Sequence, residues 1–212
     1  MVTSGIDFSN IDGMTNSEII DIMDGSNICL NGIPDFPIPV NGATGDLVSN
    51  RYPIICGGSN GIMPSSKICF KVTDNGKWNS FTNMSISRTG ASSISIGDQL
   101  WVTGGQSEGE ITKSTELISI DGAVEFGVDL PLPLWAHCMV KINENTIFLA
   151  GGQDGNYQSS AKTYFYNIRD QKWTSGPDLG TPRHLLSCGV YPYDENSTYI
   201  LTIGGRTSKF YT

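Results

Sequence analysis

The side chains best suited to catalysis are scarce in this sequence. The chain has 212 residues and two histidines, His137 and His184. Metal centres in proteins usually draw on more ligands than two histidines supply. The acidic residues Glu108, Glu110 and Asp154 lie in polar stretches, and nothing pairs two of them as an acid and a base. No phosphate-binding glycine loop occurs. We therefore expect a protein that is not an enzyme and has neither a cofactor nor a metal site.

Two arginines and a few loop residues are better suited to recognition. Arg88 and Arg183 each carry a planar guanidinium, which can hold a carboxylate through two parallel hydrogen bonds. Alternatively, both arginines could brace the chain where it crosses from one element to the next. Trp135, Asn156 and Tyr157 could add aromatic and polar contacts. The choice depends on where the fold places these residues.

The chain repeats itself, and the repeat defines the elements. Gly-Gly pairs end four short apolar runs at intervals of 47, 47 and 53 residues. A fixed interval in this range is typical of repeat architectures. Trp78 precedes Arg88 by ten residues, and Trp173 precedes Arg183 by the same ten. The residues we expect to have a structural role are the two tryptophans and the glycines Gly57, Gly58, Gly104, Gly105, Gly151, Gly152, Gly204 and Gly205.

These features resemble the kelch repeat, in which four strands make one blade: an arginine-led strand, an apolar strand ending in Gly-Gly, an aromatic strand and a tryptophan strand. The resemblance implies an all-β fold, a β-propeller of four-stranded antiparallel blades. One propeller region would span residues 1–212. Its blades would lie at about 1–41 (partial), 42–87, 88–134, 135–182 and 183–212 (partial).

The blade at 88–134 has no tryptophan in its last strand, where Val124 and Phe126 are the candidates for that position. Because the outer blades are partial, we expect an incomplete ring, a fragment of a propeller of about six blades. The remaining blades of a longer chain would then be partners of this region.

Alternating strand directions place the second-to-third loops and the blade-to-blade crossings on one face of the propeller. In kelch proteins this face holds peptide or protein partners, so we expect a non-catalytic protein-binding module. The candidate ligand-binding residues on this face are Arg88, Arg183, Trp135, Glu108, Glu110, Asp154, Asn156 and Tyr157.

Two alternatives follow from relatives of the kelch fold. One is a substrate-recognition arm of a cullin-type ubiquitin ligase adaptor, although nothing in the chain resembles the BTB domain of such adaptors. The other is a copper enzyme of the galactose-oxidase type, which needs paired His and Tyr ligands and a crosslinked Cys. Only His137 and His184 are present, and they occupy different repeat positions.

The formal net charge of −8 disfavours a nucleic-acid partner, because phosphate binding needs clustered Lys and Arg. No apolar run approaches the roughly 20 residues of a membrane span, so we expect no membrane insertion.

Five cysteines leave the redox state open. Cys56 and Cys69 would lie opposite each other if a hairpin turns near Ile62, which makes them the preferred disulfide pair. Buried free thiols are the alternative. Cys138 and Cys188 align in the repeat, so they could reflect repetition instead of pairing, and Cys29 remains odd. The possible disulfide slightly favours an extracellular location. The glycosylation sequons at Asn83 and Asn196 have meaning only in a secreted protein.

Overall fold

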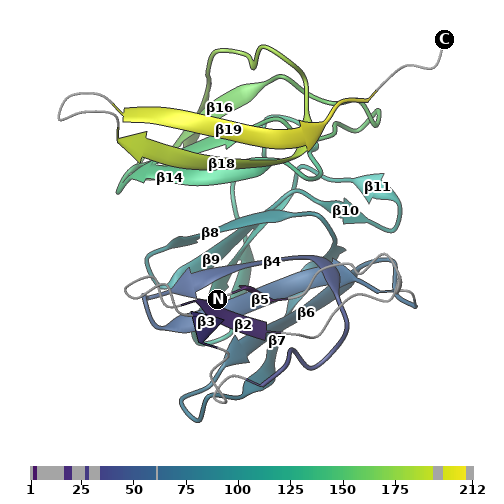
Figure 1. Ribbon diagram of the computed structural model, residues 1–212, viewed down its shortest axis with the longest axis vertical. Coiled ribbons are helices and arrows are strands. Elements are labelled where there is room, and N and C mark those ends of the chain that lie inside the picture. The colour runs from purple at the N-terminus through teal and green to yellow at the C-terminus, as the bar shows by residue number, and fades with distance from the viewer. Residues whose placement is uncertain are drawn as a thin grey trace.

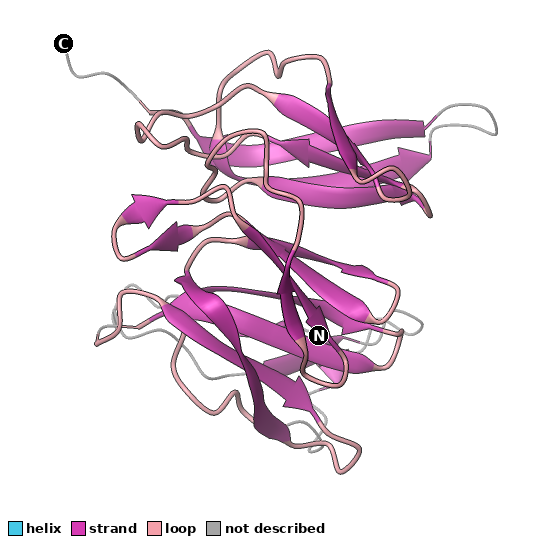
Figure 2. Cartoon of the chain, turned by 180° about the vertical axis from the view of Figure 1, so that it is seen from behind, coloured by secondary structure: helices cyan, strands magenta, loops and turns pink. Residues whose placement is uncertain are grey.

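The fold consists of β-strands, as the computed structural model shows (Figures 1 and 2). The structure describes residues 2–3, 17–20, 27–28, 34–60, 62–192 and 198–208. Among these residues, none belongs to a helix long and apolar enough to cross a membrane. The all-β class predicted from the repeats is confirmed.

Three sheets have four antiparallel strands each, in chain order from one edge to the other. The first sheet contains β4 (Asn41–Val48), β5 (Tyr52–Ser59), β6 (Ser66–Val72) and β7 (Trp78–Arg88). The second contains β8 (Ser92–Ile96), β9 (Gln99–Thr103), β12 (Thr115–Ser119) and β13 (Val124–Phe126). The third contains β14 (Cys138–Asn143), β15 (Thr146–Ala150), β16 (Thr163–Asn167) and β17 (Lys172–Ser175).

Smaller sheets accompany these three. A hairpin of β10 (Gln106–Ser107) and β11 (Glu110–Ile111) projects from the second sheet, and β18 (His184–Pro192) pairs with β19 (Thr198–Arg206). Near the N-terminus, β1 (Val2–Thr3), β2 (Ser17–Ile20) and β3 (Asn27–Ile28) form a three-stranded sheet. From the sequence we also expect a third strand of the last blade to begin at 208–211, but residues 209–211 lie outside the described residues.

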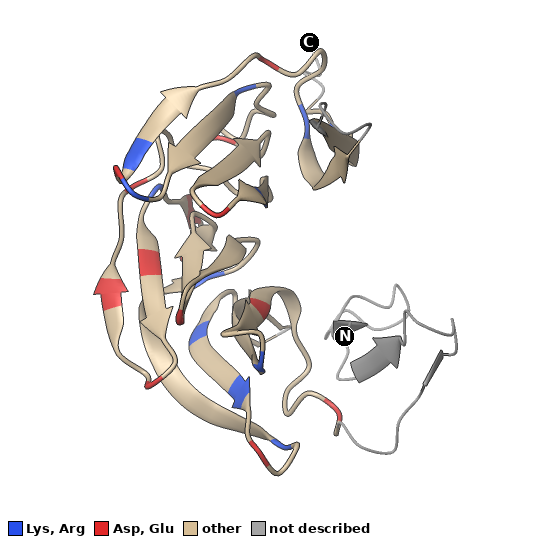
Figure 3. Cartoon of the chain, turned by 90° about the vertical axis from the view of Figure 1, so that its left-hand side faces the viewer, with Lys and Arg blue, Asp and Glu red and all other residues tan. Residues whose placement is uncertain are grey.

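The sheets follow one another along an arc, with β4, β8, β14 and β18 as neighbouring inner strands (Figure 3). Within the described residues the arc does not close into a ring, which agrees with the expected incomplete propeller. The total number of blades stays a prediction.

Apolar side chains fill the spaces between sheets. Val48, Ile54 and Met84 of the first sheet pack against Leu100 and Ile118 of the second. Between the second and third sheets, aromatic rings join the aliphatic side chains. The Trp101 ring of the second sheet lies 4.6 Å from that of Tyr166 and 5.8 Å from that of Trp173, both in the third sheet. The burial of these large rings contributes to the contact between the two blades.

The tryptophan position of the second blade is occupied by Val124. The cross-strand pairs Val72–Trp78, Ile118–Val124 and Tyr166–Trp173 are equivalent in the three sheets. Val124 packs against the core between the first two sheets, whereas Phe126 is 62% exposed. Of the two predicted candidates, Val124 is therefore the one in the repeat position.

Each Gly-Gly pair bends the chain as it leaves the second strand. All eight glycines have positive φ, between 60° and 98°. Residues with a Cβ rarely adopt this conformation, which explains why the repeat uses glycine there.

A set of backbone hydrogen bonds joins the four inner strands near their N-terminal ends. Gly90 N donates to Gly42 O, Ala136 N to Gly90 O and Leu185 N to Ala136 O, each at 2.8 Å. All four residues have positive φ, from 53° to 62°. We call this series of hydrogen bonds the crossing ladder. It ties four successive sheets together at one end of the arc.

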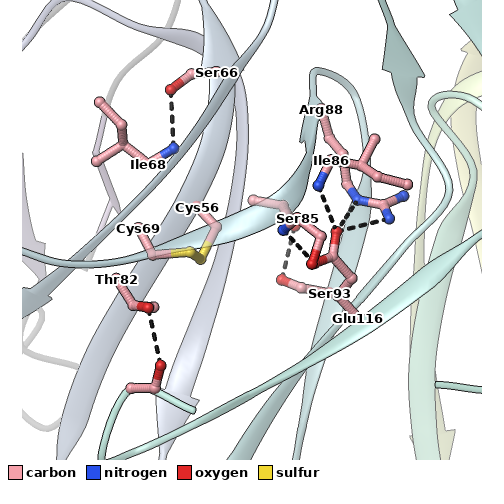
Figure 4. Close-up of a disulfide and its surroundings, with 12 residues drawn as sticks. Cys56, Ser66, Ile68, Cys69, Thr82, Ser85, Ile86, Arg88, Ser93 and Glu116 are labelled. Atoms are coloured by element: carbon pink, nitrogen blue, oxygen red, sulfur yellow. Dashed lines mark hydrogen bonds and ion pairs between the residues drawn. A yellow bond between two sulfur atoms is a disulfide. The ribbon is translucent and has the colours of Figure 1, made fainter. Parts of the chain in front are cut away.

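The described residues contain two disulfides. Cys56 and Cys69 are joined across β5 and β6 with their Cα atoms 4.0 Å apart, which is the pair preferred from the sequence (Figure 4). Cys138 and Cys188 are joined as well, with a Cα separation of 5.8 Å. This second bond connects the inner strands of neighbouring sheets, so repetition alone does not explain these two cysteines.

Candidate binding face

Four cross-strand pairs stand next to the crossing ladder, one for each successive sheet. They are Asn41–Ser59, Thr89–Gln106, Trp135–Gln153 and His184–Arg206. In every pair the second residue follows the first glycine of its Gly-Gly pair by two positions. We call them the mouth pairs. Of the predicted candidates only Trp135 belongs to this set. The other seven residues were not named as candidates, although Ser59, Gln106 and Gln153 begin the loops that the sequence places on this face, and the constant offset from Gly-Gly could also have found Arg206.

The register of the mouth pairs corrects the predicted alignment of the cysteines. Ser92, Cys138 and Ser187 each pair with the residue just before a Gly-Gly. Cys188 is therefore one position beyond the equivalent of Cys138. Arg88 and Arg183, in contrast, do share one repeat position, directly before a mouth pair.

Arg88 braces the protein internally and is not a ligand-binding residue. This corrects the expectation that Arg88 holds a carboxylate of a partner. Its side chain and that of Glu116 on β12 are both 0% exposed, and Nη2 lies 3.0 Å from Oε1 (Figure 4). Arg88 Nη1 also donates to Gly104 O at 2.7 Å and to Ser114 O at 2.9 Å. Burial lowers the pKa of Arg88, and the hydrogen bond to Glu116 opposes this effect. The guanidinium is thus fully used by the protein itself.

Glu116 uses its remaining acceptor sites on the first sheet. Its carboxylate accepts from Ser85 N at 2.6 Å and from Ile86 N at 3.1 Å, both on β7. The carboxylate therefore connects the last strand of one blade to the third strand of the next. A buried ion pair tolerates its loss of hydration only when such extra hydrogen bonds are made.

Arg183 makes the equivalent backbone contact but lacks a carboxylate partner among the described residues. Its Nη1 donates to Gly204 O at 3.0 Å, as Arg88 Nη1 does to Gly104 O. The side chain is half-buried. Because the contact repeats that of Arg88, the bracing role applies at least in part to Arg183.

The hairpin β10–β11 and the loop at 153–159 lie side by side. The Tyr157 hydroxyl donates to Gly109 O across the two blades. Gln106 Nε2 donates to Gly109 O at 3.0 Å, and Gln153 Nε2 donates to Tyr157 O at 2.9 Å. The glutamine of each of these two mouth pairs therefore holds the loop that follows it.

The predicted acidic and polar candidates differ in what they contact. Asp154 accepts from Asn156 N and Gln158 N, so it stabilises its own loop. Glu108, Glu110 and the Asn156 side chain are exposed and make no side-chain hydrogen bond in the described part of the chain. Together with Tyr157, which is 46% exposed, they are available to a partner.

The two histidines lie in different environments and form hydrogen bonds with different residues. His137 Nε2 is 2.9 Å from Thr103 Oγ1, and burial lowers the pKa of His137 to about 4. His184 Nδ1 is 2.9 Å from Ser159 Oγ. The pKa of His184 is lowered mainly by burial and further by the positive charge of Arg206. No group of three or more His, Cys, Asp or Glu side chains placed to hold a metal occurs among the described residues.

One segment matches a hydrolase motif that the sequence reasoning overlooked. Residues 57–61 follow the pattern Gly-x-Ser-x-Gly, whose serine normally stands on a strand-to-helix turn beside a histidine. Here Ser59 ends β5, the chain continues to strand β6, and Ser59 Oγ donates to Asn41 Oδ1 at 2.8 Å. The histidines bond Thr103 and Ser159 instead, so the local arrangement does not match that motif.

Known proteins resemble this chain both in sequence and in fold. The Kelch motif model matches residues 142–180. Kelch-like protein 15 of Danio rerio is 34% identical over 80 residues, which is 36% of this chain and 12% of that protein. For the Gallus gallus and Homo sapiens proteins of the same name the identity is 31% over 80 residues. The chain thus spans only 12% to 15% of the length of these relatives.

The solved structure of YjhT superposes with a TM-score of 0.62 at 15% identity, covering 74% of this chain and 57% of that one. At this identity the likeness concerns the fold alone. The motif match, the relatives and the four-stranded blades together support the kelch-repeat β-propeller predicted from the sequence.

Proposed function

We propose that the protein is a non-catalytic binding module that holds a peptide segment of a partner protein on its loop face. The loop face comprises the mouth pairs, the hairpin β10–β11 and the loop at 153–159. The observation that carries the proposal is the set of mouth pairs: four successive sheets have polar or aromatic residues at the same repeat position beside the crossing ladder. A row of this kind suits an extended chain, which offers one side chain and one peptide group at regular intervals.

The backbone beneath the loop face is held in place by several independent contacts. The crossing ladder joins the sheets, Arg88 and Glu116 brace one crossing, and Tyr157 links two neighbouring loops. A pre-organised surface loses little conformational entropy when a partner binds. Rigidity therefore supports a binding role for these loops.

The side chains of the loop face also suggest the chemistry of the partner. Trp135 is half-buried beside His184, with ring centroids 5.8 Å apart, and offers an aromatic anchor. Three of the mouth pairs are uncharged, whereas the fourth contains Arg206, whose guanidinium has no ion pair in the described part of the chain. A partner with uncharged residues along the first three pairs and a carboxylate near the fourth would match this pattern.

A peptide-display selection against the purified protein tests the proposal. Selected peptides should bind with micromolar or tighter affinity in fluorescence anisotropy. Glu110→Ala and Asn156→Ala remove exposed loop-face side chains that make no internal side-chain contact, so they should weaken binding several-fold without changing stability. Arg206→Gln should weaken the binding of those peptides that place a carboxylate side chain near the fourth mouth pair.

The matched control is Asp170→Ala, since Asp170 is exposed in the turn between β16 and β17 at the opposite end of the blade. It should leave the affinity unchanged. Selection of no peptide, or of peptides whose affinity responds to Asp170→Ala and to none of the loop-face variants, would contradict the proposal.

A further inference from the structure

Asn83 stands on the outermost strand of the first sheet, in a sequence that accepts N-linked glycans. Asn83-Met84-Ser85 has the form Asn-x-Ser with a residue other than proline in the middle. The segment lies within β7, which pairs with β6 on one side and ends the four-stranded order of its sheet. Asn83 and Ser85 are both exposed, whereas Met84 between them is 1% exposed.

The amide of Asn83 is not used by the fold. Its side chain makes no hydrogen bond with any described residue, and its Cα partner Ile68 lies on β6. By contrast, Thr82, directly before it, donates its hydroxyl to Gly122 O at 2.9 Å. A glycan attached to Asn83 would therefore displace no native contact, and it would extend from the outer side of the blade.

The cysteines supply an independent observation about the compartment. Four of the five cysteines are paired as Cys56–Cys69 and Cys138–Cys188. Cys56 and Cys69 are 1% and 0% exposed, so their bond belongs to the core. Structural disulfides persist in oxidising compartments, and chains that enter these compartments by secretion meet the enzyme that glycosylates sequons.

We infer that Asn83 is an N-glycosylation site of this protein. The side-chain amide nitrogen of Asn83 attacks the anomeric carbon of an oligosaccharide carried on a lipid diphosphate. The new nitrogen–carbon bond replaces the bond between that carbon and the diphosphate oxygen, the amide gives up one proton, and the lipid diphosphate leaves. The second sequon begins at Asn196, which lies outside the described residues.

The position of Asn83 separates this inference from the proposed function. It lies midway along β7, five residues before Arg88, where the crossing to the next blade begins. A glycan there leaves the mouth pairs accessible. Any selected peptide should therefore bind the wild-type protein and Asn83→Gln with the same affinity. If no peptide is selected, the glycan on Asn83 can still be detected by itself.

The test is peptide mapping by mass spectrometry of the protein secreted from animal cells and of the protein isolated from its native tissue. We expect a glycan on the peptide containing Asn83 and conversion of Asn83 to Asp when a peptide N-glycosidase removes it. Asn83→Gln and Ser85→Ala should each abolish the modification. Asn79→Gln, an exposed asparagine of the same strand outside any sequon, should leave it intact.

Two results would overturn the inference. One is an unmodified Asn83 in secreted protein whose disulfides have formed. The other is native protein whose cysteines are all alkylated without prior reduction, since free thiols would place the protein in a reducing compartment.

Discussion

Arg88 and Glu116 form an ion pair that water does not reach, because both side chains are 0% exposed. Replacement of one partner leaves the other charge buried without compensation. We expect Arg88→Met to lower the free energy of unfolding by about 3–5 kcal/mol. Urea denaturation followed by tryptophan fluorescence measures this loss.

Arg51 provides the matched control, since its ion pair with Asp74 has side chains that are 65% and 72% exposed. Arg51→Met should cost less than about 1 kcal/mol. The double variant Arg88→Met with Glu116→Leu should be less destabilised than the sum of its single variants. Equal losses for Arg88→Met and Arg51→Met would disprove the bracing role.

His137 gives the stability a pH dependence with a defined sign. Its pKa falls from the ordinary 6.5 to about 4 because the neutral ring is buried. The unfolded chain therefore binds more protons than the folded protein below pH 6.5, and stability decreases as the pH falls towards 4. Between pH 7 and pH 5 this group should cost about 2 kcal/mol. His137→Gln should show a smaller loss in unfolding experiments at the two pH values; an unchanged pH dependence would show that the group is not buried as described.

At the scale of the elements, two positions of the crossing ladder, Ala136 and Leu185, have a left-handed backbone without being glycine. Ala136 has a φ of 53°, whereas Gly42 and Gly90 stand at the equivalent positions. A left-handed conformation costs an L-residue roughly 1–2 kcal/mol, and replacement by glycine removes this cost. Part of the benefit is lost because glycine gives up more backbone entropy than alanine when the chain folds. We expect Ala136→Gly to stabilise the protein by about 0.5–1 kcal/mol, measured as a shift in the denaturation midpoint.

Gly90→Ala is the opposite substitution at an equivalent ladder position. A Cβ on Gly90 would stand 2.6 Å from Cδ1 and 2.7 Å from Cε2 of the Trp135 ring. Gly90→Ala should therefore destabilise the protein and disturb the Trp135–Gln153 mouth pair. Stabilisation by Gly90→Ala, or destabilisation by Ala136→Gly, would contradict the described geometry of the ladder.

The glycines and tryptophans explain why the elements were predictable while part of the site was not. A positive φ favours glycine, so the Gly-Gly pairs make the ends of the second strands visible in the sequence. The ion pair of Arg88 is not, because Glu116 lies 28 residues further along and arginine is among the residue types most often exposed. Arg206 was overlooked because its significance comes from the pairing of β18 with β19 across a connection longer than in the other blades.

At the scale of the whole molecule, the disulfide between Cys138 and Cys188 links two neighbouring sheets covalently. It connects β14 to β18, whereas Cys56–Cys69 joins two strands that already share a sheet. We expect the double variant Cys138→Ser/Cys188→Ser to lower the stability of the β18–β19 sheet by about 2–4 kcal/mol. Amide hydrogen exchange should then rise in 184–192 and 198–206 and stay low in the three four-stranded sheets. A uniform rise over all sheets would contradict this.

The central claim is that the loop face is where this propeller binds its partner. Its most direct test is amide hydrogen exchange of the protein with and without a selected peptide. We predict protection at 40–42, 89–91, 135–137 and 183–185, together with 106–111 and 153–159. Protection confined to the turns at the opposite ends of the blades, at 73–77, 120–123 and 168–171, would contradict the claim.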